Sequence, residues 1–494
     1  METASSPSMP QNSPFPQPSP QSSGLLHPNY VPGPATFSLP GYEPELDYAK
    51  DVSRAWKEFE KNELYKETDI YTLRCSRKWS DSQDTRLNDK LLNYIIKKNE
   101  KLAFELFSIS RYLVKNQEPL PPEPKKLRIT SKGLRSLLSK YDIPSAFTSA
   151  VCRHYQTCGT GLRERIDIKS SGSVWEYWCL IPVRVQVRCK DDAHVHAKST
   201  AGSNQMDPFH YIHLPDSHVD VRGSRIALFT RHDCGTGSTF VLVINFSDGR
   251  WFDIIEEPLK RIEDTINSRG SGIAHAEPAF VHLIFLSGVI RWWNNVLLSF
   301  NQQLIECEKK LQEVMDMSDD NSTNIYAELN KSLHVMAAHL HRYSSELGQL
   351  EGILLELQEQ HKKSRPAVND KDVPGDNTAN GIDLLDDMDK RSTIDERKSG
   401  CESIEEWRRA RNGFAQLLSQ LRAVSISGRE LESKIQNIVA LLFNNSTHQE
   451  AKISRTVAMQ SYELTQKMGE DSIAMKTIAI LTMFFLPGTS YAVG

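Results

Sequence analysis

A run of apolar residues between positions 329 and 357 constrains the fold of this chain more than any other feature of its sequence. Successive members are alternately four and three residues apart, the spacing of one apolar stripe along an α-helix. The members are Leu329, Leu333, Met336, Leu340, Tyr343, Leu347, Leu350, Leu354 and Leu357. An apolar stripe of about four heptads is unfavourable when it is exposed to water. The sequence therefore predicts a long helix that packs against another helix.

A second, longer helix is predicted over residues 401–474. Its apolar positions include Trp407, Phe414, Leu418, Leu421, Leu431, Ile435, Ile438, Leu442, Ile453, Val457, Met468 and Ile473. An unbroken helix from Glu402 to Leu486 would be roughly 125 Å long at 1.5 Å per residue. Ser427 and Gly428 are its candidate interruption. A helix this long cannot belong to one compact globule, so we interpret it as a stalk.

The stalk leads into residues 475–494, in which Lys476 is the last charged residue. The 18 residues from Thr477 to Gly494 span about 27 Å as a helix, just short of a bilayer's hydrocarbon core. Pro487 and Gly488 are tolerated in a membrane helix where neighbouring groups satisfy the freed carbonyl. We therefore expect an incomplete first transmembrane helix here. The competing interpretation is a buried C-terminal helix of a soluble protein.

Basic residues gather on the side of the stalk that precedes this uncharged segment. They are Lys452, Arg455, Lys467 and Lys476. The positive-inside bias places that side in the cytosol. We therefore expect a membrane protein whose N-terminal bulk is cytosolic.

Strand signals concentrate in residues 125–275, which we interpret as a small α/β domain. In Ser173–Arg188, three valines at 183, 185 and 187 alternate with Arg184, Gln186 and Arg188, the pattern of a half-buried strand. Residues 225–230 and 239–246 flank a glycine-containing turn and predict a hairpin. A helical segment follows at 254–266.

The other parts of the chain are assigned from composition and periodicity. We expect residues 1–45 to form a disordered Pro/Ser/Gln-rich tail, 46–124 a helical N-terminal segment, and 365–400 an acidic disordered linker. Residues 276–364 hold long helices, including the coiled-coil stripe. The apolar run Ala279–Ile290 is too short to cross a bilayer and predicts a buried helix. The predicted fold class is therefore α+β, a cytosolic α/β domain followed by long helices.

Charge and cysteine usage exclude some partners and compartments. The net charge is −4 and the pI about 6.4, which gives no whole-chain reason to expect a nucleic-acid partner. The 8 cysteines include no CxxC pair and are typical of separate reduced thiols in the cytosol. The first residues lack the basic and apolar regions of a signal peptide.

The sequence lacks the motifs of several common enzyme sites. The sequence contains no phosphate-binding GxxxxGK[ST], no GxSxG and no HExxH. Metal-ligand residue types concentrate only at Asp191, Asp192, His194, His196, His210, His213 and His218, without a cysteine at ligand spacing. We interpret them as surface loop residues. The sequence therefore predicts no catalytic residues, no cofactor and no small-molecule substrate.

Residues 471–489, DSIAMKTIAILTMFFLPGT, resemble the start of the first transmembrane helix of CorA-like magnesium and divalent-cation transporters, in the divergent branch common in fungi. That pattern has Met-Lys, then a Leu/Ile-Thr element, then Pro and Thr some twelve residues on. The matching residues are Met475, Lys476, Leu481, Thr482, Pro487, Gly488 and Thr489. The motif covers about 20 residues, and the order of domains matches loosely over 46–489.

The resemblance implies a homopentamer in which stalk helices line a central pore through lipid. The implied pore-lining residues are Ser472, Met475, Ile478 and Leu486, of which the last three would form a hydrophobic constriction that gates by dewetting. Magnesium is implied as the transported and regulatory ion. No motif assigns the regulatory carboxylates, so the metal ligands stay unknown.

The sequence departs from the family after Thr489. The family expects an aromatic residue, more apolar helix, a Gly-Met-Asn loop and a second membrane helix, whereas this sequence has only Ser490–Gly494. We therefore expect a C-terminally truncated gene model or short splice product that builds no selective pore as written. The alternative functions are a membrane-tethered or a soluble coiled-coil scaffold that acts through partners.

Overall fold

The computed structural model describes residues 48–76, 82–98, 100, 102–111, 126–167, 172–188, 209, 211–247, 252–269, 278–316, 322–363 and 390–490. At some helix and strand ends, including 484–490, only the backbone is described. The predicted tail over 1–45, residues 365–389 of the predicted linker, and the loop with Asp191, Asp192, His194 and His196 lie outside these ranges, as do His210 and residues 491–494.

An eight-stranded mixed sheet forms the body of the chain, with strand order β2-β1-β3-β8-β7-β5-β4 and β6 paired to β7. The strands are β1 Ile70–Ser76, β2 Ser82–Leu87, β3 Leu102–Ser110, β4 Gly159–Asp167, β5 Gly172–Arg188, β6 Ile212–Leu214, β7 Val219–Asp233 and β8 Ser238–Asn245. The β3–β8 pair is parallel and the other neighbours are antiparallel.

The predicted hairpin is confirmed. β7 and β8 pair antiparallel from Ile226 opposite Asn245 to Asp233 opposite Ser238. In the turn, Asp233 Oδ1 accepts the N–H groups of Gly235 and Thr236 at 2.9 and 3.2 Å. Gly237 has φ +63°, a conformation that favours glycine.

The prediction of a helical segment over 46–124 is wrong for three of its elements. The helices α1 Tyr48–Glu63 and α2 Asp89–Lys97 are present, but β1, β2 and β3 belong to the sheet. The strand β3 is almost wholly buried and pairs in parallel with β8, far along the chain. A short apolar run does not distinguish a buried helix from a buried strand, so distant pairing decided its form. The sheet therefore also crosses the predicted domain boundary at residue 125.

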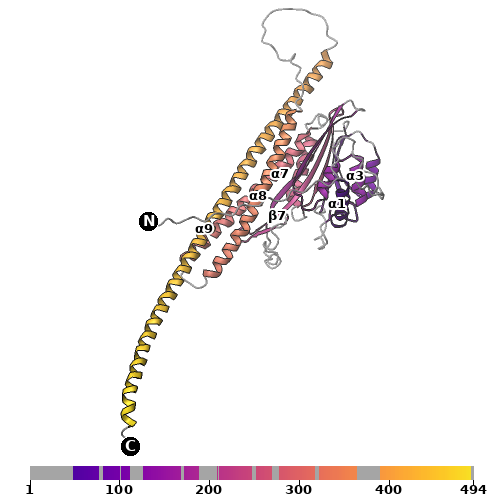
Figure 1. Cartoon of the computed structure of the whole chain (residues 1–494). Coiled ribbons are helices and arrows are strands. Elements are labelled where there is room, and N and C mark those ends of the chain that lie inside the picture. The colour runs from indigo at the N-terminus through magenta and orange to yellow at the C-terminus, as the bar shows by residue number, and fades with distance from the viewer. Residues whose placement is uncertain are drawn as a thin grey trace, which may run out of the picture. The chain divides into compact units, whose positions relative to one another are not determined.

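Helices cover both faces of the sheet, as Figure 1 shows. The remaining helices are α3 Ser131–Lys140, α4 Ser145–Cys152, α6 Phe252–Arg269, α7 Ala279–Asp316, α8 Ser322–Lys363 and α9 Lys390–Ser490. Side chains alternate along β3, so that Phe104 and Leu106 join the core shared with α7, α8 and α9. Phe107 and Ile109 join the core under α1, α3 and α4. The α+β fold class is therefore confirmed.

The helix α7 packs against the sheet, as predicted for the run that begins at Ala279. It is the one helix, among those whose side chains are described, that is long and apolar enough to cross a membrane. In the most apolar 18-residue stretch of α7, 67% of the residues are buried, and the helix contacts β5. This burial is typical of a core helix.

The buried His282 on α7 gives the folded chain a predictable response to acid. It lies beside the ring of Tyr177 on β5, with centroids 5.5 Å apart, and burial lowers the pKa of His282 to about 3. The unfolded chain binds a proton at this position below pH ~6.5 whereas the folded chain does not. The free energy of unfolding should therefore fall by about 2 kcal/mol from pH 6.5 to pH 5 through this group alone.

Urea unfolding at the two pH values measures this effect. The variant His282→Gln should lose that part of the pH dependence, and the exposed control His448→Gln should keep it. An unchanged pH dependence in His282→Gln would contradict the assignment.

The predicted coiled-coil stripe is confirmed on α8. All nine of its members, from Leu329 to Leu357, are buried. The covering helices come from the same chain, because α8 packs mainly on α9 and also on α7 (Figure 1).

The stalk helix α9 is longer than predicted and continuous. It begins at Lys390, within the segment predicted as linker, because residues 390–399 contain no proline or glycine and are rich in charged helix formers. The expected interruption at Ser427–Gly428 is absent. Gly428 lies where α9 meets α7 and α8, since a Cβ atom at this position would be in ordinary van der Waals contact with Leu297 and Leu347. The helix is therefore roughly 150 Å long at 1.5 Å per residue.

Candidate functional site

The candidate site is the C-terminal half of α9, which extends beyond the other described helices and strands. The N-terminal end of α8 lies beside Asn445, whose side-chain amide donates to Tyr326 Oη. Every residue from 450 to 483 is exposed, and α9 continues there without a covering element among the described parts of the chain (Figure 1). We call residues 450–490 the free half of α9.

The predicted membrane-entry and pore residues all lie on the free half. Met475 is 72% exposed, Ile478 61% and Leu481 48%. Around an ideal helix, Met475 lies about 60° from both Ser472 and Ile478. These three residues therefore share one face. The pore-lining role assigned to them stays a prediction.

The backbone of Leu486, Pro487, Gly488 and Thr489 lies in α9, so the helix continues through the predicted proline motif. Leu486 is eleven residues after Met475, which places it about 20° away around the helix. It therefore extends the face of Met475 and Ile478 by register.

Two threonine hydroxyls in this segment are bonded within the helix. Thr477 Oγ1 donates to Ile473 O at 2.9 Å, and Thr482 Oγ1 donates to Ile478 O at 2.8 Å and Ala479 O at 3.0 Å. An unsatisfied hydroxyl is costly in an apolar medium. These hydrogen bonds remove that cost, so both threonines are compatible with insertion into lipid.

An ion pair that the sequence did not reveal joins the sheet to the helices. Arg184 of β5 is 1% exposed, although the strand pattern placed it on the polar side. Its Nε donates to Glu346 Oε2 of α8 at 2.8 Å, and its Nη2 also bonds the same carboxylate. The guanidinium lies 4.9 Å from the ring centre of Tyr343. The alternating pattern of β5 placed Arg184, Gln186 and Arg188 on its solvent-facing side. This expectation is wrong for Arg184, because α8 covers it.

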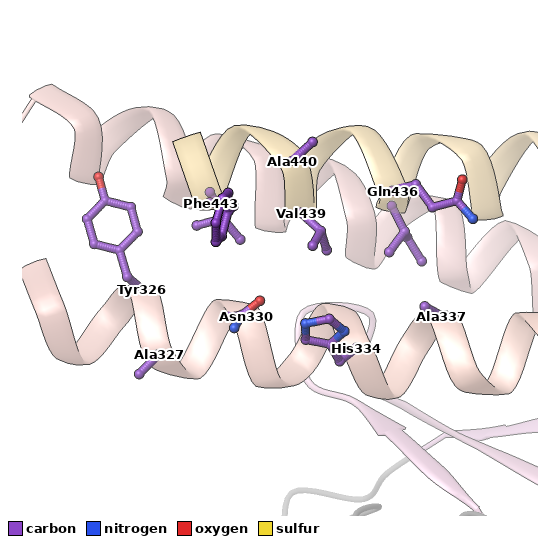
Figure 2. Close-up of a pocket in the computed structure, with 11 residues that line it drawn as sticks. Tyr326, Ala327, Asn330, His334, Ala337, Gln436, Val439, Ala440 and Phe443 are labelled. Carbon is purple, nitrogen blue, oxygen red and sulfur yellow. The ribbon is translucent and has the colours of Figure 1, made fainter. Parts of the chain in front are cut away.

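An open groove lies between α8 and α9, close to the start of the free half (Figure 2). Its volume is ≈ 710 Å³, and side chains that line it include Tyr326, Asn330 and His334 from α8 and Gln436, Val439 and Phe443 from α9. Alanines at 327, 337 and 440 also line it. The sequence analysis did not predict this groove, because it depends on the packing of two helices that are distant in the sequence.

Within the described ranges, no group of three or more His, Cys, Asp or Glu side chains is placed to hold a metal ion. Of the histidines noted in the sequence, His213 Nδ1 lies 2.9 Å from Asp220 Oδ1, and His218 occupies a turn with φ +52°. His218 is exposed in this turn, as the interpretation of a surface loop residue expects. The same interpretation is wrong for His213, which lies half-buried in β6 because that strand pairs with β7.

Comparison with known proteins gives structural similarity only. The sequence matches no protein-family profile and no curated protein. The ZntB cytoplasmic domain of Vibrio parahaemolyticus is 8% identical over 75% of this chain and 97% of its own length, with a TM-score of 0.28. The full-length CmaX protein is 12% identical over 87% of this chain and 85% of its own, with a TM-score of 0.33. The soluble domain of CorA from Methanocaldococcus jannaschii is 10% identical over 71% of this chain and 95% of its own length, with a TM-score of 0.28. These are loose overlaps.

Proposed function

We propose that this chain is a CorA-like divalent-cation transport protein, with its sheet and packed helices in the cytosol and the end of α9 in a membrane. The observation that carries the proposal is the free half of α9. It is an exposed helix whose charged residues end at Lys476 and whose apolar content rises from there to Leu486.

The free half is unsuited to stand alone in water. Met475, Ile478, Ile480, Leu481 and Met483 are between 48% and 80% exposed within this segment. A row of exposed apolar side chains of this kind is typical of a surface that contacts protein or lipid. Lipid suits the segment after Lys476 because it is uncharged, its described threonine hydroxyls are bonded, and the basic residues precede it.

In the proposed assembly, copies of the chain form a homo-oligomer, a pentamer by resemblance, around a pore along α9. Ser472, Met475, Ile478 and Leu486 face this pore, and magnesium is the transported ion. The shared helix face of these four positions supports the proposal. A hydrophobic constriction at the last three would close the path by excluding water.

Carbonate extraction of membranes from expressing cells tests the membrane part. The native chain should stay in the pellet. Leu481→Arg should release most of it, because arginine at the centre of a membrane helix is about 3 kcal/mol less favourable than leucine. The control Tyr462→Arg changes an exposed residue upstream of Lys476 and should leave the chain in the pellet. Release of the native chain by carbonate would refute the membrane assignment.

Magnesium-dependent growth of a transporter-deficient host tests the transport part. We expect growth when the native chain is joined to a second membrane helix with its Gly-Met-Asn loop. Met475→Asp in the same fusion, which places charge in the constriction, should change the growth response. A membrane-bound fusion that never supports growth would favour the alternative, a membrane-tethered coiled-coil scaffold.

A further inference from the structure

A basic cluster lies at the edge of the sheet where the parallel strands β3 and β8 both end. Arg111 directly follows β3, and Phe246 and Ser247 directly follow β8. Arg225 of β7 lies beside them, because its carbonyl oxygen accepts the N–H of Phe246 at 3.2 Å. In open α/β sheets, ligands bind outside the carboxyl ends of parallel strands. This edge is therefore a candidate ligand site.

Two guanidinium groups of the cluster meet on one aromatic ring. The guanidinium carbons of Arg111 and Arg225 lie 5.4 and 4.3 Å from the ring centre of Phe246. Arg225 is 2% exposed, and its Nη atoms donate to carbonyl oxygens at the end of α4 and just beyond it. Burial lowers the pKa of Arg225 to about 10, and the charge of Arg111 acts in the same direction. Two like charges are therefore close together in a buried place.

Arg128 adds a third guanidinium group on the same side. Leu64 and Leu127 form a parallel bridge and are both buried in the core, so their neighbours Glu63 and Arg128 point to the other side of this bridge. The N–H of Arg128 donates to the carbonyl oxygen of the last residue of β3 at 2.9 Å. Arg128 therefore lies beside the residue that follows β3.

One carboxylate is shared by this group of basic residues. Glu63 pairs with Arg111 and lies 3.2 Å from Nδ1 of His154. Within the described ranges, no second carboxylate bonds to any of the three arginines. Because buried charge is normally compensated, the excess positive charge favours an anion as a further partner.

Four buried polar atoms of the cluster have no hydrogen-bond partner among the described residues. They are the Nε atoms of Arg111, Arg128 and Arg225, and Oγ of Ser247. Buried polar groups in folded proteins are nearly always hydrogen-bonded, so these four indicate a site for a further polar group. Three guanidinium donors and one hydroxyl suit the oxygens of a tetrahedral oxyanion better than the two oxygens of a carboxylate.

We propose that this basic cluster, made of Arg111, Arg128, His154, Arg225 and Ser247, binds the phosphate group of a small solute. The side chains of Arg111 and His154 are 18% and 52% exposed, so they mark the side from which the phosphate enters. Rotation of the Arg111 guanidinium on entry turns its unpaired N–H toward the ligand, a side-chain change of a kind common on binding.

The cluster is independent of α9, so the inference does not rest on the proposed function. Its members are far apart in the sequence, between positions 111 and 247. No short phosphate-binding motif therefore marks the site, and only the pairing of β3 with β8 and β7 brings the residues together.

Isothermal titration calorimetry of the full chain in detergent tests the proposal. The probes are inorganic phosphate, ribose 5-phosphate and ADP at constant ionic strength, and we expect saturable binding of at least one of them. Arg111→Gln should weaken this binding about tenfold or more, because a charged hydrogen bond to the phosphate is lost. The matched control is Arg74→Gln on the neighbouring strand β1. Arg74 is 15% exposed and also pairs with glutamate, so its loss should leave the affinity unchanged.

Ser247→Ala separates the loss of binding from a loss of folding. It removes a buried hydroxyl that has no described partner, so the urea midpoint without phosphate should be equal to or higher than that of the native chain. The same variant should bind the phosphate probe several-fold more weakly, because the hydroxyl no longer donates to it.

Three results would overturn the proposal. They are no saturable binding of any probe, equal affinity in the native chain, Arg111→Gln and Ser247→Ala, or an equal loss in Arg111→Gln and Arg74→Gln. The last would show attraction to the general charge of the domain. Tighter binding of ribose 5-phosphate or ADP than of inorganic phosphate would identify the phosphate group of a larger solute as the ligand. The reverse order would identify free phosphate.

Discussion

Glu346→Gln should lower the free energy of unfolding of this protein by about 3–5 kcal/mol. The substitution keeps the size of the side chain but removes the charge that compensates Arg184. The two side chains are only 4% and 2% exposed, so water cannot solvate the guanidinium that remains. Removing one charge of a buried ion pair is among the most destabilising changes in a folded protein. Urea unfolding followed by tryptophan fluorescence, in detergent, measures the change.

Two further variants distinguish the cost of removing one charge of the ion pair from the net contribution of the whole pair to stability. Arg184→Met with Glu346→Leu removes both charges and should recover most of the loss, because apolar residues of similar size replace a buried pair at little expense. Glu405→Gln breaks an exposed pair with Arg409 on α9 and should cost at most about 1 kcal/mol. Similar losses for Glu346→Gln and Glu405→Gln would contradict the burial of the Arg184 pair.

Trp293→Ala should lower the free energy of unfolding by about 3–5 kcal/mol, the usual range for a large aromatic residue removed from a core. Trp293 on α7 is fully buried, and its ring meets Tyr343 of α8 edge-on with centroids 5.2 Å apart. Its indole N–H donates to Pro182 O of β5 at 3.4 Å. One side chain therefore joins the sheet to two helices, and its loss leaves a cavity among all three.

The control Trp293→Phe keeps an aromatic ring and most of the buried volume. We expect it to cost about 1–2 kcal/mol, less than half of the alanine variant, when both are compared by urea unfolding under the same conditions. If both substitutions had equally small effects, Trp293 would not fill the junction of β5, α7 and α8.

The helices with long periodic patterns were predictable from the sequence. The stripe from Leu329 to Leu357 defines one face of α8, and its nine apolar members leave little choice but a covering helix. The hairpin β7–β8 was equally predictable, because its turn residues lie between two apolar runs. In both cases neighbouring residues in the sequence contain the whole signal.

The strand β3 and the ion pair of Arg184 were not predictable in this way. The apolar run of β3 is compatible with a helix or a strand, and only its parallel partner β8 selects the strand. Arg184 has the sequence context of a solvent-facing residue, and Glu346 is 162 residues away. Pairings over such distances depend on how the chain packs as a whole.

The sequence by itself therefore determined which segments are long helices, which residue is the last charged one, and which face of the last helix is apolar. These properties depend on the spacing of neighbouring side chains. Only the tertiary structure decided that the apolar stripe of α9 is used in two ways. Up to Leu442 it is buried against α7 and α8, and beyond Asn445 it is exposed, because α8 begins beside that residue and no described element covers α9 further on.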